Sequence, residues 1–189
     1  MAFTIKANFI AVFKIGDNIN YNLKILKVLY DDYDKNVGRR ALLIKPIVII
    51  NASIAEAILY DFIENRIRKA NKTEPLFPEI LSFLNAKKID KFEHYIAQAK
   101  KYDFFDQKDT NFYEAMDSLR RKRNRIHIQN NKNEKPENEF ELFNERSKIL
   151  SEKVLEKILN TMTIKYPRRE EYRGYVNDFQ FPWDKHFKE

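Results

Sequence analysis

The chain has no cysteine, only three glycines and only three histidines among its 189 residues. Without cysteine it can form neither a disulfide nor a thiolate zinc site. Three scattered histidines also argue against a dedicated transition-metal site, so we expect no metal and no other cofactor. Because tight turns depend on glycine, its scarcity argues against a β protein with many turns.

We also expect the sequence to lack an apolar run long enough to cross a membrane. Its most apolar segment, residues 41–50, is interrupted by Lys45 and Pro46, whereas a spanning helix needs about 20 mainly apolar residues. Nothing at the N-terminus resembles a signal peptide, because Lys6 and Lys14 break up the apolar residues there. We therefore expect a cytoplasmic protein with no membrane partner.

Positive charge exceeds negative charge along the chain. There are 35 lysine and arginine residues against 28 aspartate and glutamate residues, which gives a formal net charge of +7. This balance favours an acidic partner, either nucleic acid, an anionic membrane surface or an acidic protein. Composition does not choose among these, but 43% of apolar residues is enough for a folded core.

Apolar periodicity predicts a mainly helical chain. Within residues 19–33, apolar side chains recur at spacings of three and four, as in an amphipathic helix, and Gly38 provides a stop. Pro46 is expected to begin a helix that runs to Lys69, because proline is tolerated in a first turn. Residues 3–15 alternate with a period of two, which favours a strand but leaves a helix open. Four further helices are predicted at residues 79–85, 90–102, 111–129 and 139–162.

These elements predict an all-α fold, an up-and-down bundle of four to five main helices with N- and C-terminal extensions. We divide the chain into an N-terminal extension (1–40), a helical bundle (41–167) and a C-terminal tail (168–189). The tail carries six aromatic side chains. A free tail rarely leaves so many rings in water, so we expect it to dock on the bundle or on a partner.

The segment LRRKRNRIHI, residues 119–128, places five basic side chains in six positions next to a histidine. On a helix at 100° per residue, two of these side chains, Arg120 and Arg123, lie within about 60° of His127, and so does Asn124. Two arginines at this spacing repel each other, and a phosphate anion would relieve the repulsion. The remaining basic side chains, Arg121, Lys122 and Arg125, would contact RNA or other phosphates from neighbouring directions.

A histidine beside two arginines suits RNA cleavage. Imidazole titrates near pH 6.5, so it can take the proton of a ribose 2′-hydroxyl, while arginine stays charged and stabilises the phosphorane. The residues alone leave other interpretations open. A basic cluster is also typical of a solvated helix face, and a histidine near a helix C-terminus interacts favourably with the dipole. Glu56 is either a surface glutamate or a supporting carboxylate for the arginines. His94 and His186 are expected to be structural or incidental.

The segment SLRRKRNRIHI, which follows FYEAMD, resembles the signature segment of the HEPN family of helical domains. The upstream segment PIVIINASIAEAILYDFI resembles the first core helix of that family, which often carries a small and an acidic residue like Ser53 and Glu56. The resemblance covers residues 41–162. It implies a four- to five-helix bundle, a homodimer that brings two motifs together, and metal-independent endoribonuclease activity. Such domains commonly act as toxins or phage-defence effectors.

The family motif is an arginine, usually followed by a polar residue, and then a histidine after four to six intervening residues. His127 matches the histidine. Arg123 is followed by Asn124 but has only three residues before His127. Arg121 and Arg120 have five and six intervening residues but are followed by basic side chains. The choice of arginine stays open.

The leading hypothesis is therefore a dimeric HEPN-like ribonuclease. His127 would act as general base or acid, Arg123 and Arg120 would bind phosphate, and Asn124 would orient the reacting groups. RNA, a second copy of the chain and an antitoxin or other partner protein are the expected partners. The alternatives are a nucleic-acid-binding module without catalysis, and an interaction protein that grips a partner with its aromatic tail.

Overall fold

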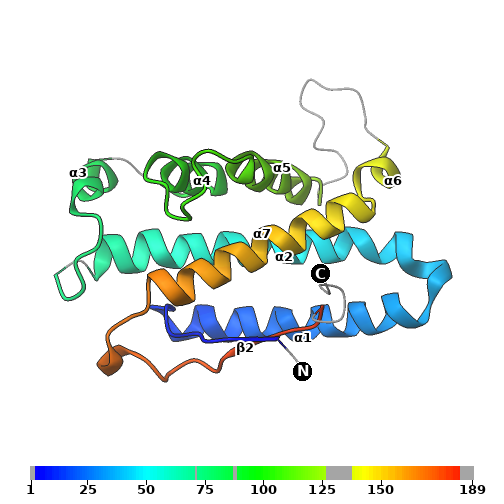
Figure 1. Cartoon of the computed structure of the whole chain (residues 1–189), viewed down its shortest axis with the longest axis horizontal. Helices are drawn as coiled ribbons and strands as arrows, with labels where there is room; N and C mark the ends of the chain where they lie inside the picture. The colour runs from blue at the N-terminus through cyan, green and yellow to red at the C-terminus, as the bar shows by residue number, and fades with distance from the viewer. Residues whose placement is uncertain (1–2, 71, 87–88, 127–137, 184–189) are drawn as a thin grey trace.

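A computed structural model of the chain describes residues 3–70, 72–86, 89–126 and 138–183. Within these ranges it has seven α-helices and two short strands (Figure 1). The prediction of an all-α bundle is confirmed. The elements are β1 (Phe3–Ile5), α1 (Phe13–Lys35), α2 (Arg40–Tyr60), α3 (Pro78–Ala86), α4 (Phe92–Lys101), α5 (Phe112–Asn124), α6 (Glu139–Leu142), α7 (Glu145–Lys165) and β2 (Phe179–Phe181).

Helix α2 is the centre of the bundle. It lies between α1 on one side and the α4–α5 row on the other, and α7 crosses it obliquely (Figure 1). Its apolar residues surround the helix rather than forming one stripe, so it is buried from several directions. Ile47, Val48 and Leu59 are completely buried. The helix continues through a π-helical stretch, Asp61–Lys69, which is also buried over most of its length.

Contrary to the expectation from the sequence, the continuous helical segment Val37–Lys69 is long and apolar enough to cross a membrane by length and composition. Half of its most apolar part is buried inside the bundle. The core helix of a soluble protein passes the same test, so this feature is weak evidence for membrane insertion.

The prediction of a strand over residues 3–15 is wrong beyond Ile5. Pairing with β2 ends there, with Ile5 opposite Phe179, and side chains take the next backbone donors. Asp178 Oδ1 accepts from the Ala7 N–H at 2.9 Å, and Asp61 Oδ2 accepts from the Ala11 N–H at 2.7 Å. Because side chains accept from these backbone N–H groups, residues 6–12 need no partner strand, and α1 begins at Phe13.

The predicted helix boundary at Pro46 is also wrong, because α2 begins at Arg40 and contains the proline. An internal proline removes one helical hydrogen bond. Side-chain contacts hold the turn that precedes it: Ile44 is buried, and Lys45 forms an ion pair with Glu139 at 2.7 Å. These contacts join distant parts of the chain, so the local sequence does not reveal them. Similarly, α1 ends at Lys35 rather than at Gly38.

The helix predicted at residues 139–162 is divided into α6 and α7. Asn144 caps α7: its side chain accepts from the Ser147 N–H at 3.1 Å, and Ser147 Oγ accepts from the Asn144 N–H at 3.1 Å. This reciprocal pair is a capping box and satisfies two donors at the start of a helix. Asn111, which precedes α5, forms no such side-chain cap.

The N- and C-terminal segments lie together against α1. Strands β1 and β2 pair antiparallel, and β2 runs beside α1 (Figure 1). Trp183 is buried, and its ring lies 5.7 Å from that of Tyr30 and 4.9 Å from that of Phe181. A Cβ atom at Gly16 would overlap Val176, so glycine allows the C-terminal segment to pass close to α1.

A buried polar network joins α1 to α7. The Tyr30 hydroxyl donates to Glu152, which also accepts from Lys148 Nζ at 3.0 Å. Burial, followed by the negative charge of Glu152, raises the pKa of the Tyr30 hydroxyl well above its usual range. The neutral hydroxyl therefore stabilises the fold below the unfolded-state pKa of about 10, and this stabilisation is lost as the pH rises further.

Replacing Tyr30 with phenylalanine should lower the free energy of unfolding by about 1.5–3 kcal/mol at neutral pH, because a buried bond to a carboxylate is lost. Above about pH 10, the free energy of unfolding should also fall less in the variant than in the wild type. Urea unfolding at both pH values measures these effects. Tyr21→Phe on the exposed side of α1 is the control and should change stability by less than about 0.5 kcal/mol. Equal effects of the two variants would contradict this role of Tyr30.

Candidate functional site

Helix α5 places the basic segment at its C-terminal end. Tyr113, Met116 and Leu119 are buried and anchor the helix in the bundle. Arg120, Arg123 and Asn124 belong to the last turn and are partly exposed. The anchoring apolar residues thus fix the position of the polar residues that follow them.

The predicted helix over residues 111–129 is wrong at its C-terminal end, because α5 ends at Asn124. The next two residues form a turn in which the Arg125 N–H donates to the Lys122 carbonyl and the Ile126 N–H donates to the Arg123 carbonyl. Bonds of this i to i−3 type are common where an α-helix ends. The helical projection therefore applies only as far as Asn124. His127 lies outside the described residues.

Three elements meet around a cavity of about 380 Å³ at the end of α5. We call it the α5 cavity. Helix α5 contributes two arginines and an asparagine, α2 contributes one carboxylate, and the segment leading into α4 contributes charged side chains of both signs. The polar lining includes Glu56, Lys91, Glu93, Arg120, Arg123 and Asn124.

Carboxylates neutralise both arginines in this cavity. The Arg123 guanidinium forms an ion pair with Glu56, and its Nη1 also donates to Asn124 Oδ1 at 3.1 Å. Arg120 Nε lies 2.7 Å from Asp117 Oδ1, and Arg120 Nη1 lies 3.2 Å from Glu93 Oε2. Repulsion between the arginines is thus relieved inside the chain, and no external phosphate is needed for that purpose.

Burial lowers the pKa of the Arg123 guanidinium. Its side chain is nevertheless about one-third exposed, and arginine has five N–H donors, more than Glu56 and Asn124 use. The guanidinium is therefore held in a fixed position with donors still directed toward the cavity or solvent. Glu56 takes the supporting position that the sequence suggested as one of two alternatives.

The other basic residues of the segment do not line the α5 cavity. Arg121 is two-thirds exposed and pairs with Asp117 at 3.3 Å. Lys122 Nζ donates to the Leu142 carbonyl at 2.8 Å and so connects α5 to α6. Arg125 is partly buried in the turn after α5. Of the three, Arg121 is the most accessible to an external anion.

The remaining candidates lie elsewhere. His94, on α4, lies 3.9 Å from Asp90 and 3.8 Å from Glu93 but does not line the α5 cavity. Ser53 donates to the Ile49 carbonyl at 2.8 Å within α2. His186 lies outside the described residues. In the part of the chain that the structure describes, no group of three His, Asp or Glu side chains could hold a metal ion.

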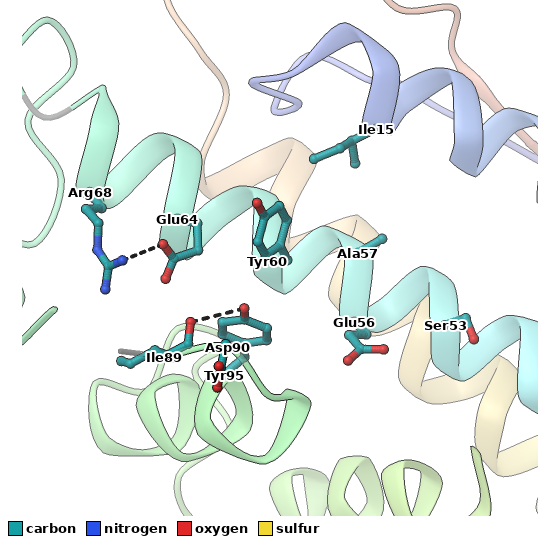
Figure 2. Close-up of a pocket in the computed structure, with 10 residues that line it drawn as sticks. All are labelled: Ile15, Ser53, Glu56, Ala57, Tyr60, Glu64, Arg68, Ile89, Asp90 and Tyr95. Carbon is teal, nitrogen blue, oxygen red and sulfur yellow. Dashed lines mark hydrogen bonds and ion pairs between the residues drawn. The ribbon is translucent and has the colours of Figure 1, made fainter. Parts of the chain in front are cut away.

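Sequence reasoning missed a second cavity, of about 510 Å³, on the neighbouring face of α2 (Figure 2). We call it the α2 cavity. It shares Glu56 and Asp90 with the α5 cavity and also contains Tyr60, Glu64 and Tyr95. The signal in the sequence was weak: polar residues recur at three- and four-residue spacings along α2, as they would on any solvated helix face.

Comparison of the chain with protein-family models, with curated proteins and with solved structures finds no match.

Proposed function

We propose that the protein is a metal-independent endoribonuclease of the HEPN type that acts at the α5 cavity. One observation carries the proposal: Arg120, Arg123 and Asn124 line the same cavity, and His127 follows three residues after Asn124 in the sequence. The cavity offers cationic donors for a phosphate, and histidine, whose ordinary pKa is close to neutral pH, follows in the sequence.

In the proposed reaction, the neutral His127 imidazole takes the proton of a ribose 2′-hydroxyl. The 2′-oxygen attacks phosphorus, and the bond from phosphorus to the 5′-oxygen breaks. The products are a 2′,3′-cyclic phosphate and a 5′-hydroxyl, which receives a proton from a general acid. The histidine of a second copy in a homodimer would supply that proton, because a protonated imidazole is an effective acid at neutral pH.

Arg123 would stabilise the charge that develops on the phosphoryl oxygens. Glu56 would act as a positioning residue, because its ion pair holds the guanidinium in place. Arg120 would add a second donor from one turn earlier, and Arg121 would contact flanking phosphates. We further propose that the protein works in the cytoplasm as a toxin or phage-defence effector under the control of a partner protein.

The experiment is RNA cleavage by the purified full chain in EDTA. We expect cleavage by the wild type and a loss of at least about 10²-fold in rate for His127→Ala, because general acid–base catalysis typically contributes that much or more. His186→Ala is the matched histidine control and should cleave like the wild type. An inert wild type, or a His127→Ala variant as active as the wild type, would refute the catalytic proposal.

A second candidate function is RNA binding without catalysis. The observation that favours it is the neutralisation of Arg120 and Arg123 by carboxylates, which leaves less free positive charge to stabilise a transition state. In that case RNA affinity should fall steeply as salt increases. Arg121→Ala should weaken binding, and no cleavage product should form at any salt concentration.

A further inference from the structure

Glu64, in the π-helical continuation of α2, has a buried carboxylate that borders the α2 cavity. Its side chain is only 9% exposed. One oxygen, Oε2, accepts from Arg68 Nη1 at 2.7 Å. The other, Oε1, is buried and has no hydrogen-bond partner among the described residues. A buried acceptor without a partner is costly, so a ligand that donates to Oε1 would gain free energy there.

Glu64 lines the α2 cavity from the π-helical continuation of α2, with Oε1 itself buried. Figure 2 shows Glu64 and Arg68 projecting from the helix toward the segment that carries Ile89, Asp90 and Tyr95. Arg68 also donates to the Leu84 carbonyl, which helps to fix it on the side of Glu64 away from the cavity centre. One oxygen of the carboxylate is thus held by Arg68, and the other has no hydrogen-bond partner among the described residues.

The charge of the α2 cavity is opposite to that of the whole protein. Among the described residues its lining holds three carboxylates, Glu56, Glu64 and Asp90, and one guanidinium, that of Arg68. Glu56 is also paired with Arg123 of the α5 cavity, which leaves one carboxylate in excess of the guanidinium groups. The chain as a whole has a net charge of +7. Burial, followed by the negative charge of Glu64, raises the pKa of the Tyr95 hydroxyl to about 12. The cavity therefore favours a cation over a phosphate group.

Two aromatic rings form part of the wall. Tyr60 and Tyr95 lie edge to face, with ring centroids 6.1 Å apart and planes at 71°. Tyr60 is 39% exposed, so its ring is accessible to a ligand. The face of a tyrosine ring attracts a cation, and guanidinium also stacks on such rings because it is planar and weakly hydrated.

We propose that the α2 cavity binds a guanidinium group, which would donate to Glu64 Oε1 and pack against Tyr60. A carboxylate beside aromatic rings matches the planar donor fork of guanidinium better than the compact ammonium group of lysine. The group could belong to a small guanidine compound or to an arginine side chain of a partner protein. The proposal does not depend on RNA cleavage.

Isothermal titration of the full chain with agmatine and with Nα-acetyl-L-arginine amide tests this site. Citrulline, whose ureido group has nearly the same shape as guanidinium but no charge, is the ligand control. We expect saturable binding of a guanidinium compound and at least about tenfold weaker binding of citrulline. Glu64→Gln should weaken guanidinium binding by at least about tenfold, because a charged acceptor is lost. Glu79→Gln, an exposed glutamate on α3, should leave binding unchanged.

Tyr60→Leu gives an independent test if Glu64→Gln does not fold, because Tyr60 is partly exposed and its replacement should be tolerated. It should also weaken guanidinium binding. Binding of agmatine without the blocked arginine would assign the site to a small molecule, whereas binding of the blocked arginine would assign it to a polypeptide. The proposal is overturned if neither guanidinium compound binds at about 10 mM, or if citrulline binds as tightly as the guanidinium compounds.

Discussion

Arg123→Ala is expected to reduce the rate of RNA cleavage by about 10²–10³-fold, because a preorganised donor to the developing charge would be lost. The structure makes Arg123 the better choice among the three arginines that the sequence left open. It is fixed by Glu56 from α2 and by Asn124 from its own helix. Arg120 is tied to two carboxylates, and Arg121 does not line the cavity.

Two variants accompany this test. Arg39→Ala removes an arginine that is 69% exposed, outside the bundle core, and should leave cleavage unchanged. Arg123→Lys keeps the charge but loses the planar fork, and it should recover only part of the rate. Cleavage is measured under single-turnover conditions, with circular dichroism to establish that each variant is folded. Wild-type cleavage by folded Arg123→Ala would remove this residue from the mechanism.

Glu74→Gln is expected to lower the free energy of unfolding by about 3 kcal/mol or more, because it leaves the buried Arg66 and the partly buried Arg168 without the charge of Glu74. Glu74 lies 2.7 Å from Arg168 Nη2 and 3.8 Å from Arg66 Nη2, and it accepts from the Arg169 N–H at 3.2 Å. The side chains of Glu74 and Arg66 are only 5% and 2% exposed. This cluster connects the end of the α2 segment to the chain that follows α7.

The same cluster gives the protein a dependence on acid. Burial acts to raise the pKa of Glu74, but hydrogen bonds from Arg168 and from the Arg169 N–H outweigh it, and the net pKa is lowered. The ionised carboxylate therefore stabilises the fold above the unfolded-state pKa, near 4.5, and this stabilisation is lost as the pH falls through the lower folded-state pKa. Glu74→Gln should lack this part of the acid dependence.

Urea unfolding of Glu74→Gln between about pH 3 and pH 7 measures both effects. Glu170→Gln, an exposed glutamate near the same segment, is the matched control and should change stability by less than about 0.5 kcal/mol. A Glu74→Gln variant as stable as this control at neutral pH would show that the arginines do not need the charge of Glu74.

The sequence predicted the parts of the fold that depend on local periodicity. The apolar stripe of α1 and the apolar character of α2 were sufficient to identify both helices. Pro46 misled the prediction because Lys45 and Glu139, 94 positions apart in the sequence, hold the turn before it. The end of α5 was also mispredicted, since the run of basic residues has a helical pattern, whereas the chain leaves the helix after Asn124 through i to i−3 bonds at Arg125 and Ile126.

The candidate site shows the same division. A buried carboxylate needs a cationic partner, so the sequence suggested pairing of Glu56 with the motif arginines as one of two alternatives. In the structure Glu56 lies beside Arg123. The positions of Glu93 and Lys91 in the wall of the α5 cavity could not be predicted, because they depend on how the beginning of α4 packs beside α5. The α2 cavity was missed for the same reason, since Tyr60, Glu64 and Tyr95 come from two packed helices.

The most direct test of the central claim is the chemistry of the RNA ends formed by the purified protein in EDTA. We expect fragments with 2′,3′-cyclic phosphate and 5′-hydroxyl ends, and no cleavage of a strand that lacks 2′-hydroxyls. We also expect His127→Ala to form few or no such fragments. Fragments with 3′-hydroxyl and 5′-phosphate ends, or no fragments from the wild type, would contradict the proposed ribonuclease activity.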